Sequence, residues 1–163
     1  MCLKSEPGTN PPQEEGMVII MLQQISVFVE NKAGRLCAIV EVLNESRINI
    51  RAMNIADTAD YGIVRLIVSD TENALKAFNE NNFTARVFDV IAFTIPDKFG
   101  ALYEVIKLLG DNGINIEYSY SLIGKNKSEA GIVIYVKNPD KNAEAGEILI
   151  KAGVNLITPV DIA

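Results

Sequence analysis

Two seven-residue stretches decide the organisation of this chain: Glu30-Asn-Lys-Ala-Gly-Arg-Leu36 and Pro96-Asp-Lys-Phe-Gly-Ala-Leu102. They lie 66 positions apart, and the same offset superposes Ile48-Asn-Ile50 on Ile114-Asn-Ile116. Because Lys, Gly, Leu and the Ile-Asn-Ile triplet recur with one common spacing, the sequence predicts two tandem copies of one structural unit.

Each copy begins with a strand, a polar turn and an amphipathic helix. Alternating apolar residues over 25–29 and 91–95 predict the strands, and the repeated stretches supply the turns. An apolar spacing of i, i+3, i+4 and i+7 predicts the helices, which end near 45–47 and 111–113. The apolar helix positions are Leu36, Ile39, Val40 and Leu43, and then Leu102, Val105, Ile106 and Leu109.

Each copy then continues with two strands, a second helix and a short final strand. These strands are predicted from Ile48 and Ile114, over 62–68 and 131–136, and over 84–87 and 155–157. The capping residues Asp70 and Asn138 mark the starts of the second helices. The order βαββαβ predicts an α+β protein of two tandem ferredoxin-like units, each an antiparallel sheet with both helices on one face.

The predicted domain organisation is a disordered lead-in at 1–22, a first unit at 23–88 and a second at 89–163. Residues 1–16 are rich in Pro, Gly and Glu, which is typical of a disordered segment. Only about two residues separate the last strand of one unit from the first of the next, so we expect close docking. The third strands are apolar on both faces, so the sister unit, a second chain or both should cover the face without helices. Strongly twisted strand edges that tolerate exposed Val and Ile are the alternative.

Composition excludes several classes of function. The formal net charge of −6 and the sequence pI of about 4.7 argue against nucleic acid and anionic membranes as partners. The apolar run 17–22 is much shorter than the roughly 20 residues of a membrane span. With two cysteines and no histidine, the chain lacks a disulfide framework and the usual residues of metal and acid–base sites. We expect a cytoplasmic protein without metal, cofactor or catalysis.

The repeated turn is the first candidate binding element, because it places glycine where the backbone enters a helix N-terminus. Free N–H groups and the helix dipole attract carboxylate or phosphate there. Asn31 can donate and accept hydrogen bonds, whereas ionised Asp97 only accepts, so the two copies are not equivalent. The alternative is that both are ordinary capping or turn residues. Asn49 and Asn115 open the predicted second strands, where they are either ligand-binding or turn residues.

These motifs resemble ACT domains, small amino-acid-binding modules attached to enzymes such as 3-phosphoglycerate dehydrogenase, aspartate kinase and prephenate dehydratase. The resemblance covers residues 23–160. It implies that a free amino acid lies between two modules, held as in serine-binding members of the family by the Asn of the turn and the Asn opening the second strand. Asp97 departs from that pattern. The ligand-binding residues so implied are Asn31, Lys32, Ala33, Gly34, Arg35, Leu36, Asn49, Asp97, Lys98, Phe99, Gly100, Ala101, Leu102 and Asn115.

The chain is also similar to stand-alone tandem ACT proteins of bacteria that have a Glu-Tyr-x-Tyr-Ser stretch, here Glu117-Tyr-Ser-Tyr-Ser121. Strand alternation sends Tyr118 and Tyr120 to one face, where they either contact ligand or pack against a helix or partner sheet. The resemblance implies a regulatory module that binds a free amino acid and acts on an unidentified partner enzyme. A structural adaptor with a vestigial pocket is the alternative. We also expect a homodimer through sheet faces or edges.

Overall fold

The computed structural model describes residues 19–57, 61–123 and 128–163, so most of the predicted lead-in lies outside it. In chain order the elements are β1 (Leu22–Glu30), α1 (Arg35–Glu45), β2 (Ile50–Asp57), β3 (Tyr61–Val68), α2 (Thr71–Glu80), β4 (Thr84–Pro96), α3 (Ala101–Asp111), β5 (Tyr118–Leu122), β6 (Glu129–Tyr135), α4 (Pro139–Lys151), β7 (Asn155–Ile157) and α5 (Pro159–Ile162). Of the helices described, none has the length and apolarity needed to span a membrane.

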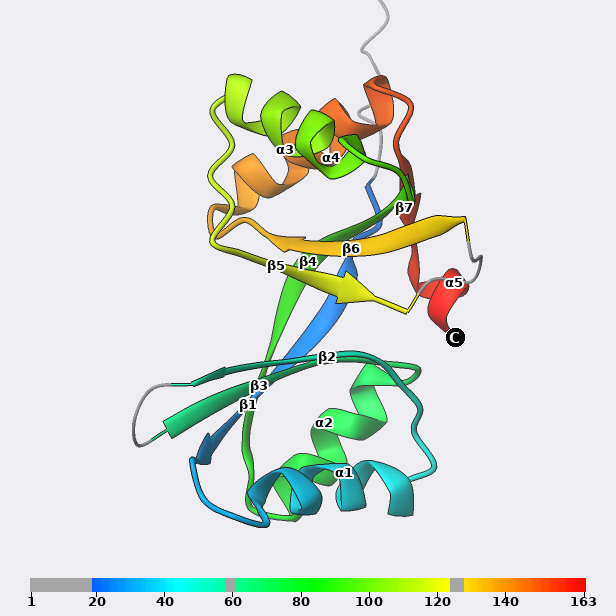
Figure 1. The fold of residues 1–163 in the computed structure, drawn as a ribbon. Coiled ribbons are helices and arrows are strands. Elements are labelled where there is room, and N and C mark those ends of the chain that lie inside the picture. The colour runs from blue at the N-terminus through cyan, green and yellow to red at the C-terminus, as the bar shows by residue number, and fades with distance from the viewer. Residues whose placement is uncertain (1–18, 58–60, 124–127) are drawn as a thin grey trace, which may run out of the picture.

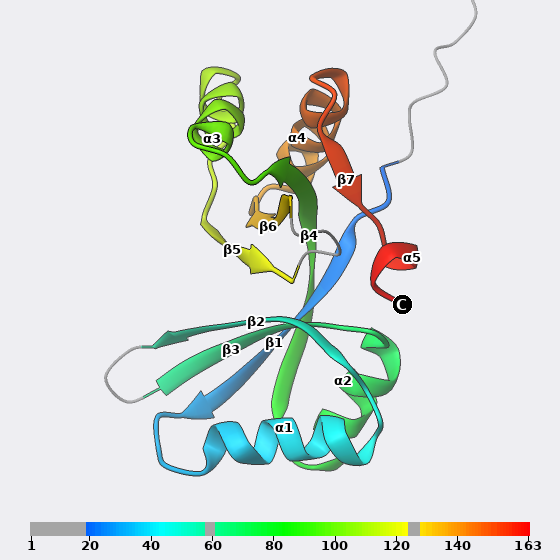
Figure 2. The same ribbon diagram turned by 45° about the vertical axis from the view of Figure 1, so that its right-hand side comes forward.

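The strands pair in the order β2-β3-β1-β4-β6-β5, with β7 also on β4, and every pairing is antiparallel. In each repeat two helices cover one face of the sheet, so the molecule has helices at its two ends and sheets between them (Figure 1). The view turned by 45° shows the same layers (Figure 2). The predicted pair of ferredoxin-like units is therefore confirmed.

The link between the repeats differs from the prediction of two short strands separated by a gap. β4 is one strand of 13 residues that runs through the predicted boundary between 88 and 89. Its first half pairs with β1 up to Val90, and its second half pairs with β6 from Ile91 onward. No Gly or Pro stands between Thr84 and Ile95, so nothing in the sequence breaks the extended backbone.

The second strands begin later than predicted, which changes the setting of two candidate site residues. β2 begins at Ile50 and β5 at Tyr118, so Asn49 and Asn115 lie in the loops before these strands. At the N-terminal end, Leu22 already belongs to β1 and is fully buried. The short helix α5 has no counterpart in the prediction.

Each repeat has its own apolar core between its helices and its sheet. In the first repeat α1 buries Ile39 and Leu43, and in the second α3 buries the equivalent Val105 and Leu109. Of the remaining apolar positions of the predicted helix stripes, Leu36, Val40 and Leu102 are 37%, 38% and 43% exposed, and Ile106 is half-buried. The predicted stripe is therefore wider than the face that the core uses.

A third apolar cluster lies between the repeats, where the faces without helices meet. Its buried members are Leu22, Ala52, Ile67, Val90, Ala92, Tyr120, Leu122 and Val133. They come from β1, β2, β3 and β4 and from β5 and β6 of the second repeat. The sister repeat therefore covers the helix-free faces of β3 and β6, which are the third strands of the two repeats. This was one of the predicted possibilities.

A buried polar network crosses this contact and centres on Gln24, whose side chain has no exposed surface. The Tyr120 hydroxyl donates to Gln24 Oε1 at 2.7 Å. Gln24 Nε2 donates to the Tyr118 hydroxyl at 2.8 Å and to Ser26 Oγ at 3.1 Å. Because buried amides are costly unless bonded, this network fixes how the two sheets face each other.

Aromatic contacts extend the network to the rim of the interface. Tyr118 stacks on Tyr135 with ring centroids 4.9 Å apart, and the Arg65 guanidinium lies 3.9 Å from the Tyr118 ring centroid. Arg65 in turn donates to Asn54 Oδ1 at 3.3 Å. Tyr118 and Tyr120 thus share one face as predicted, and that face packs against the partner sheet.

We expect Tyr120→Phe to lower the free energy of unfolding by about 1–3 kcal/mol, because Gln24 Oε1 would lose its buried donor. Tyr118→Phe should cost less, since Tyr118 is only half-buried and water can replace its hydroxyl. Urea unfolding of both variants checks this order. Equal costs would contradict the assignment of the buried bond to Tyr120.

Burial, helped by the neighbouring Tyr118, raises the pKa of the Tyr120 hydroxyl far above its ordinary value. The neutral hydroxyl is then favoured in the folded state. The stability that it contributes to the fold is fully present below about pH 10, the ordinary pKa of tyrosine, and is lost as the pH rises further through the raised pKa. Urea unfolding across this range should show a steeper loss of stability for wild type than for Tyr120→Phe. Tyr103→Phe, which changes a tyrosine with 68% exposure, is the matched control and should follow wild type.

Candidate functional site

The two repeated turns have the same backbone geometry. The N–H of Lys32 donates to Glu30 O, and that of Lys98 to Pro96 O, each at 2.9 Å. Gly34 and Gly100 then form the N-caps of α1 and α3 with φ of 87° and 86°. These angles fall in the left-handed region that favours glycine, which explains why glycine recurs in both turns.

Asn31 and Asp97 do not cap these helices, because neither α1 nor α3 has a side-chain cap within the described residues. The capping part of that alternative is therefore wrong, whereas its turn part agrees with the structure, which places both exposed side chains in the turns. In the first turn Lys32 Nζ lies 3.0 Å from Glu30 Oε2. This hydrogen bond and charge hold the pKa of the Glu30 carboxyl below its ordinary value.

Within one repeat, the turn and the asparagine after the helix lie at opposite ends of the sheet. Glu30 pairs with the first residue of β3, Tyr61, whereas Asn49 is bonded to Ser69 just beyond its last residue. Eight residues of strand separate these points by roughly 25 Å. In the second repeat, Asp97 and Asn115 likewise flank opposite ends of β6.

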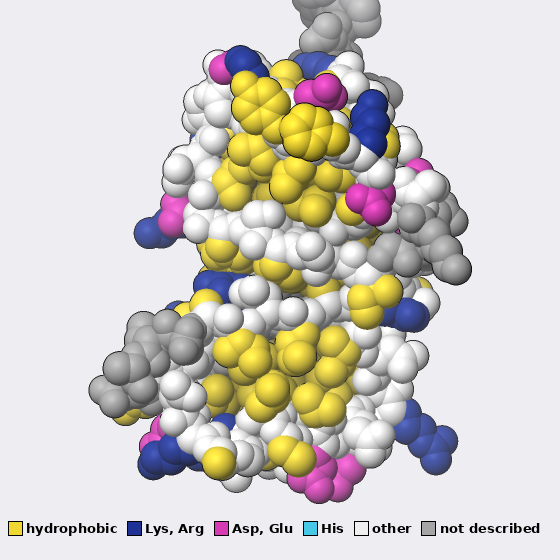
Figure 3. All heavy atoms as spheres, in the orientation of Figure 1, with side chains coloured by type: hydrophobic (Ala, Val, Ile, Leu, Met, Phe, Trp, Pro, Cys, Tyr) yellow, Lys and Arg dark blue, Asp and Glu magenta, His cyan; other side chains and the backbone are white. Residues whose placement is uncertain are grey.

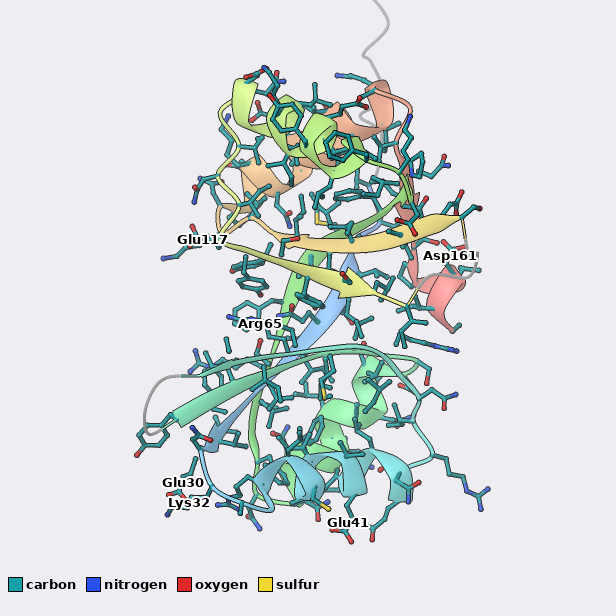
Figure 4. All side chains as sticks on the ribbon, in the orientation of Figure 1. Glu30, Lys32, Glu41, Arg65, Glu117 and Asp161 are labelled. Carbon is teal, nitrogen blue, oxygen red and sulfur yellow. The ribbon has the colours of Figure 1, made fainter. Side chains whose placement is uncertain are left out.

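The turns of the two repeats are also far from each other. The first turn lies beyond Thr84, the start of β4, and the second follows its end at Pro96. Thirteen residues of strand span roughly 40 Å. Figure 4 shows Glu30 and Lys32 at the first turn, which lies at the end of the first repeat that is remote from the second repeat. One chain therefore does not bring the predicted turns together into one shared site.

The predicted residues lie at four separate places. Those at the first turn, Asn31 to Leu36, are all exposed. At the second turn Phe99 is fully exposed, whereas Ala101 is 4% exposed and belongs to the core. Lys98 and Ala101 line a hollow of about 260 Å³ between the second turn and the loop before β7. Asn49 and Asn115 are both exposed at the opposite sheet ends.

Asn115 borders a pocket of about 440 Å³, which we call the Asn115 pocket. It is lined by Gly113, Asn115, Glu117, Val136, Lys137, Asn138 and Lys141. These residues come from the loop between α3 and β5, and from the end of β6 with the start of α4. The volume falls within the range of roughly 300–1,000 Å³ typical of small-molecule sites.

The polar groups of the Asn115 pocket form a charged and ordered rim. Asn115 Nδ2 donates to Glu117 Oε1 at 2.9 Å, which orients the amide and leaves its oxygen as an acceptor. Asn138 Oδ1 caps α4 by accepting from the N–H groups of Asp140 and Lys141. The lysines and the positive end of the α4 dipole favour a carboxylate, and Glu117 favours an ammonium group.

The equivalent end of the first repeat has a different chemistry. Arg51 occupies the place of Glu117, and its guanidinium donates to the backbone carbonyl oxygens of Ile162 at 2.8 Å and Ala163 at 3.1 Å. A cavity of about 640 Å³ lies here. Among the described residues that line it, Asp70, Glu72 and Asp89 are acidic and none is Lys or Arg. The C-terminal helix thus occupies this end of the first repeat, whereas the pocket at the equivalent end of the second repeat, the Asn115 pocket, is lined by residues of both charge signs.

The chain matches the ACT domain pair family over residues 20–163. It therefore belongs to this family of regulatory domains, as the resemblance implied. A comparison with curated proteins finds no match.

Solved structures give the same picture of the fold. The protein BT0572 from Bacteroides thetaiotaomicron is 39% identical with a TM-score of 0.80, over 88% of this chain and 96% of that one. The regulatory subunit of aspartate kinase from Thermus thermophilus is 15% identical with a TM-score of 0.58, over 82% and 93%. That from Thermus flavus is 16% identical with a TM-score of 0.57, over 83% and 94%. At this lower identity the aspartate kinase subunits show a shared fold.

Sequence reasoning named Asn115 as a site residue and quoted Glu117 within the Glu-Tyr-x-Tyr-Ser stretch, but it missed the two lysines of the pocket rim. Glu117 is two residues further on, a spacing that lets its carboxylate reach the Asn115 amide. Lys137 and Lys141 flank Asn138, which the sequence had marked only as a helix start. A cationic residue on each side of a helix cap is the signal that could have found them.

We expect Gly100→Ala to lower the free energy of unfolding by about 1–2 kcal/mol, because a Cβ is strained at this φ. The control is Gly110→Ala at an exposed position of α3, where the new Cβ meets no atom within 4 Å apart from its chain neighbours and its own helix backbone. That variant should gain up to about 1 kcal/mol from helix propensity. Urea unfolding compares the two, and a loss in both would contradict the backbone explanation.

Proposed function

We propose that this chain is a regulatory module that binds a free amino acid in the Asn115 pocket and acts on a partner protein without catalysis of its own. The observation that carries the proposal is the hydrogen-bonded Asn115–Glu117 pair facing two lysines across one pocket. A free amino acid carries one carboxylate and one ammonium group, and this rim offers a partner to each. Membership of a regulatory domain family supports the same function.

The groups divide between the two charges of the ligand. Glu117 and the free oxygen of Asn115 accept hydrogen bonds from the ammonium group. Lys137 Nζ binds the carboxylate, which the positive end of the α4 dipole also favours, while Lys141 is partly engaged by Glu144 at 2.6 Å. Val136 and Gly113 leave an apolar, uncharged wall for the side chain.

Binding has a route to the rest of the molecule. Glu117 and Val136 of the pocket directly adjoin Tyr118 and Tyr135, which pair across β5 and β6 and stack on each other. Tyr118 is bonded to Gln24 of the first repeat. A ligand that displaces either strand end therefore changes the contact between the repeats, and regulation requires that it bind the two arrangements unequally.

We expect one or a few of the twenty amino acids to raise the melting temperature of the full chain. At 100 times its dissociation constant a ligand adds about 2.7 kcal/mol to the free energy of unfolding. Asn115→Ala and Glu117→Gln should each remove most of this shift. Asn49→Ala, at the equivalent place in the first repeat, is the matched control and should keep it.

Two outcomes would contradict the proposal. A shift that survives Asn115→Ala but is lost in Asn49→Ala would move the site to the first repeat. The absence of a shift with every amino acid would favour the alternative function, a structural adaptor whose pocket is vestigial. Unfolding of each variant without ligand separates lost binding from lost stability.

A further inference from the structure

The charged side chains of the Asn115 pocket are not balanced in number. Among the described residues that line it are two lysines, Lys137 and Lys141, and one carboxylate, Glu117, so their charges sum to +1. Figure 4 shows Glu117 at the left edge of the second repeat, and Figure 3, in the same orientation, shows acidic and basic side chains at this edge. An amino acid with an uncharged side chain has no net charge, so it would leave one lysine without a counter-charge.

Lys137 is an exposed cation without a partner in its own chain. Within the described part of the chain its side chain makes no ion pair and no hydrogen bond. The residue before the helix cap of the first repeat is Ser69, whose hydroxyl accepts from the Asn49 N–H at 3.1 Å. The second repeat therefore has an unpaired positive charge at its pocket where the first repeat has a hydroxyl that ties down a loop.

Lys141 stands where helix α4 disfavours a positive charge. It is the third residue of α4 and so lies in the first turn, where the helix dipole favours anions. Its ion pair with Glu144 joins two side chains that are each 45% exposed, and such pairs stabilise a fold little. The corresponding residue of α2 is the uncharged Asn73. Helix stability therefore does not account for this lysine, whereas a negatively charged ligand would.

We infer that the Asn115 pocket selects an amino acid with a second carboxylate, aspartate or glutamate; the inference rests on the proposed function and names its ligand class. The ammonium group lies at Glu117 and Asn115 Oδ1, and the α-carboxylate at Lys137. The side-chain carboxylate takes Lys141 from Glu144, which does not line the pocket. Each of the three ligand charges then has a partner of opposite sign.

The selectivity resides in the lysine side chains. The backbone N–H groups of Asp140 and Lys141 at the start of α4 already donate to Asn138 Oδ1, so they are not available to a second carboxylate. A basic amino acid is disfavoured, because it would place a positive charge beside the two lysines and leave Glu117 to serve two cations.

Asparagine and glutamine are matched ligands for the test, because they keep the shapes of aspartate and glutamate and lack the second negative charge. Isothermal titration calorimetry of the full chain compares them. We expect aspartate or glutamate to bind about tenfold or more tightly than its amide, which is the effect of one charge-assisted hydrogen bond. Added salt should reduce this ratio. Succinate, which lacks the ammonium group, should bind more weakly than aspartate.

Variants assign the preference to single side chains. Lys141→Gln removes the charge and keeps a good helix former, so it should lower the affinity for the dicarboxylic amino acid about tenfold or more and leave that for the amide unchanged. Lys137→Gln should lower both affinities. Lys151→Gln, which changes a lysine of α4 that is likewise paired with a glutamate, Glu147 at 3.5 Å, is the matched control and should change neither. Thermal unfolding without ligand establishes that each variant is folded.

The outcomes distinguish this inference from the proposed function. Equal affinities for an acid and its amide, tighter binding of any uncharged amino acid, or a preference for the acid that survives Lys141→Gln would overturn the inference and leave an amino-acid sensor in place. Succinate binding as tight as that of aspartate would overturn it as well, because the pocket would then recognise an anion and not an amino acid. Failure of all twenty amino acids to bind would overturn both.

Discussion

The fully buried amide of Gln24 is the constraint on which the arrangement of the two repeats depends. Apolar packing between two sheets is tolerant of rotation, because any overlap of apolar surfaces removes area from water. The bonds of Gln24 to Tyr118, Tyr120 and Ser26 are directional, and leaving any one unmade in the interior costs free energy. The network therefore selects one relative orientation of sheets that apolar contact alone would leave loosely defined.

The repeat organisation and the order of elements could be predicted because their causes are local. Glycine at a positive φ before each first helix and the alternating apolar strands are visible in the amino-acid order. The continuity of β4 was less visible, because a strand that changes partners at Val90 and Ile91 has no local mark there. Which surface covers the third strands is a property of the assembled sheets, and the sequence left that choice open.

The residues of the candidate site divide in the same way, into those that the sequence reveals and those that it does not. Asn115 was found through the repeated Ile-Asn-Ile triplet, but Lys137 and Lys141 stand where the first repeat has different residues. Comparison of the copies therefore could not find them. The difference between the repeats is itself informative: one sheet end is lined by carboxylates, and the other offers both lysines and a carboxylate. The two repeats therefore share a scaffold, while one sheet end is acidic and the other has mixed charge.

The uninterrupted β4 makes the two repeats mechanically inseparable. Two domains joined by a flexible linker can each unfold or rotate independently. A single twisted strand shared by two sheets instead couples a rotation of one helix layer to the other. A break in the chain near Phe88 would leave each half of β4 with its own sheet, but the strand would no longer hold the two sheets together over the apolar cluster between them. Folding and unfolding should therefore be cooperative across the whole length, and the tandem pair, rather than the single repeat, is the smallest autonomous unit of this protein.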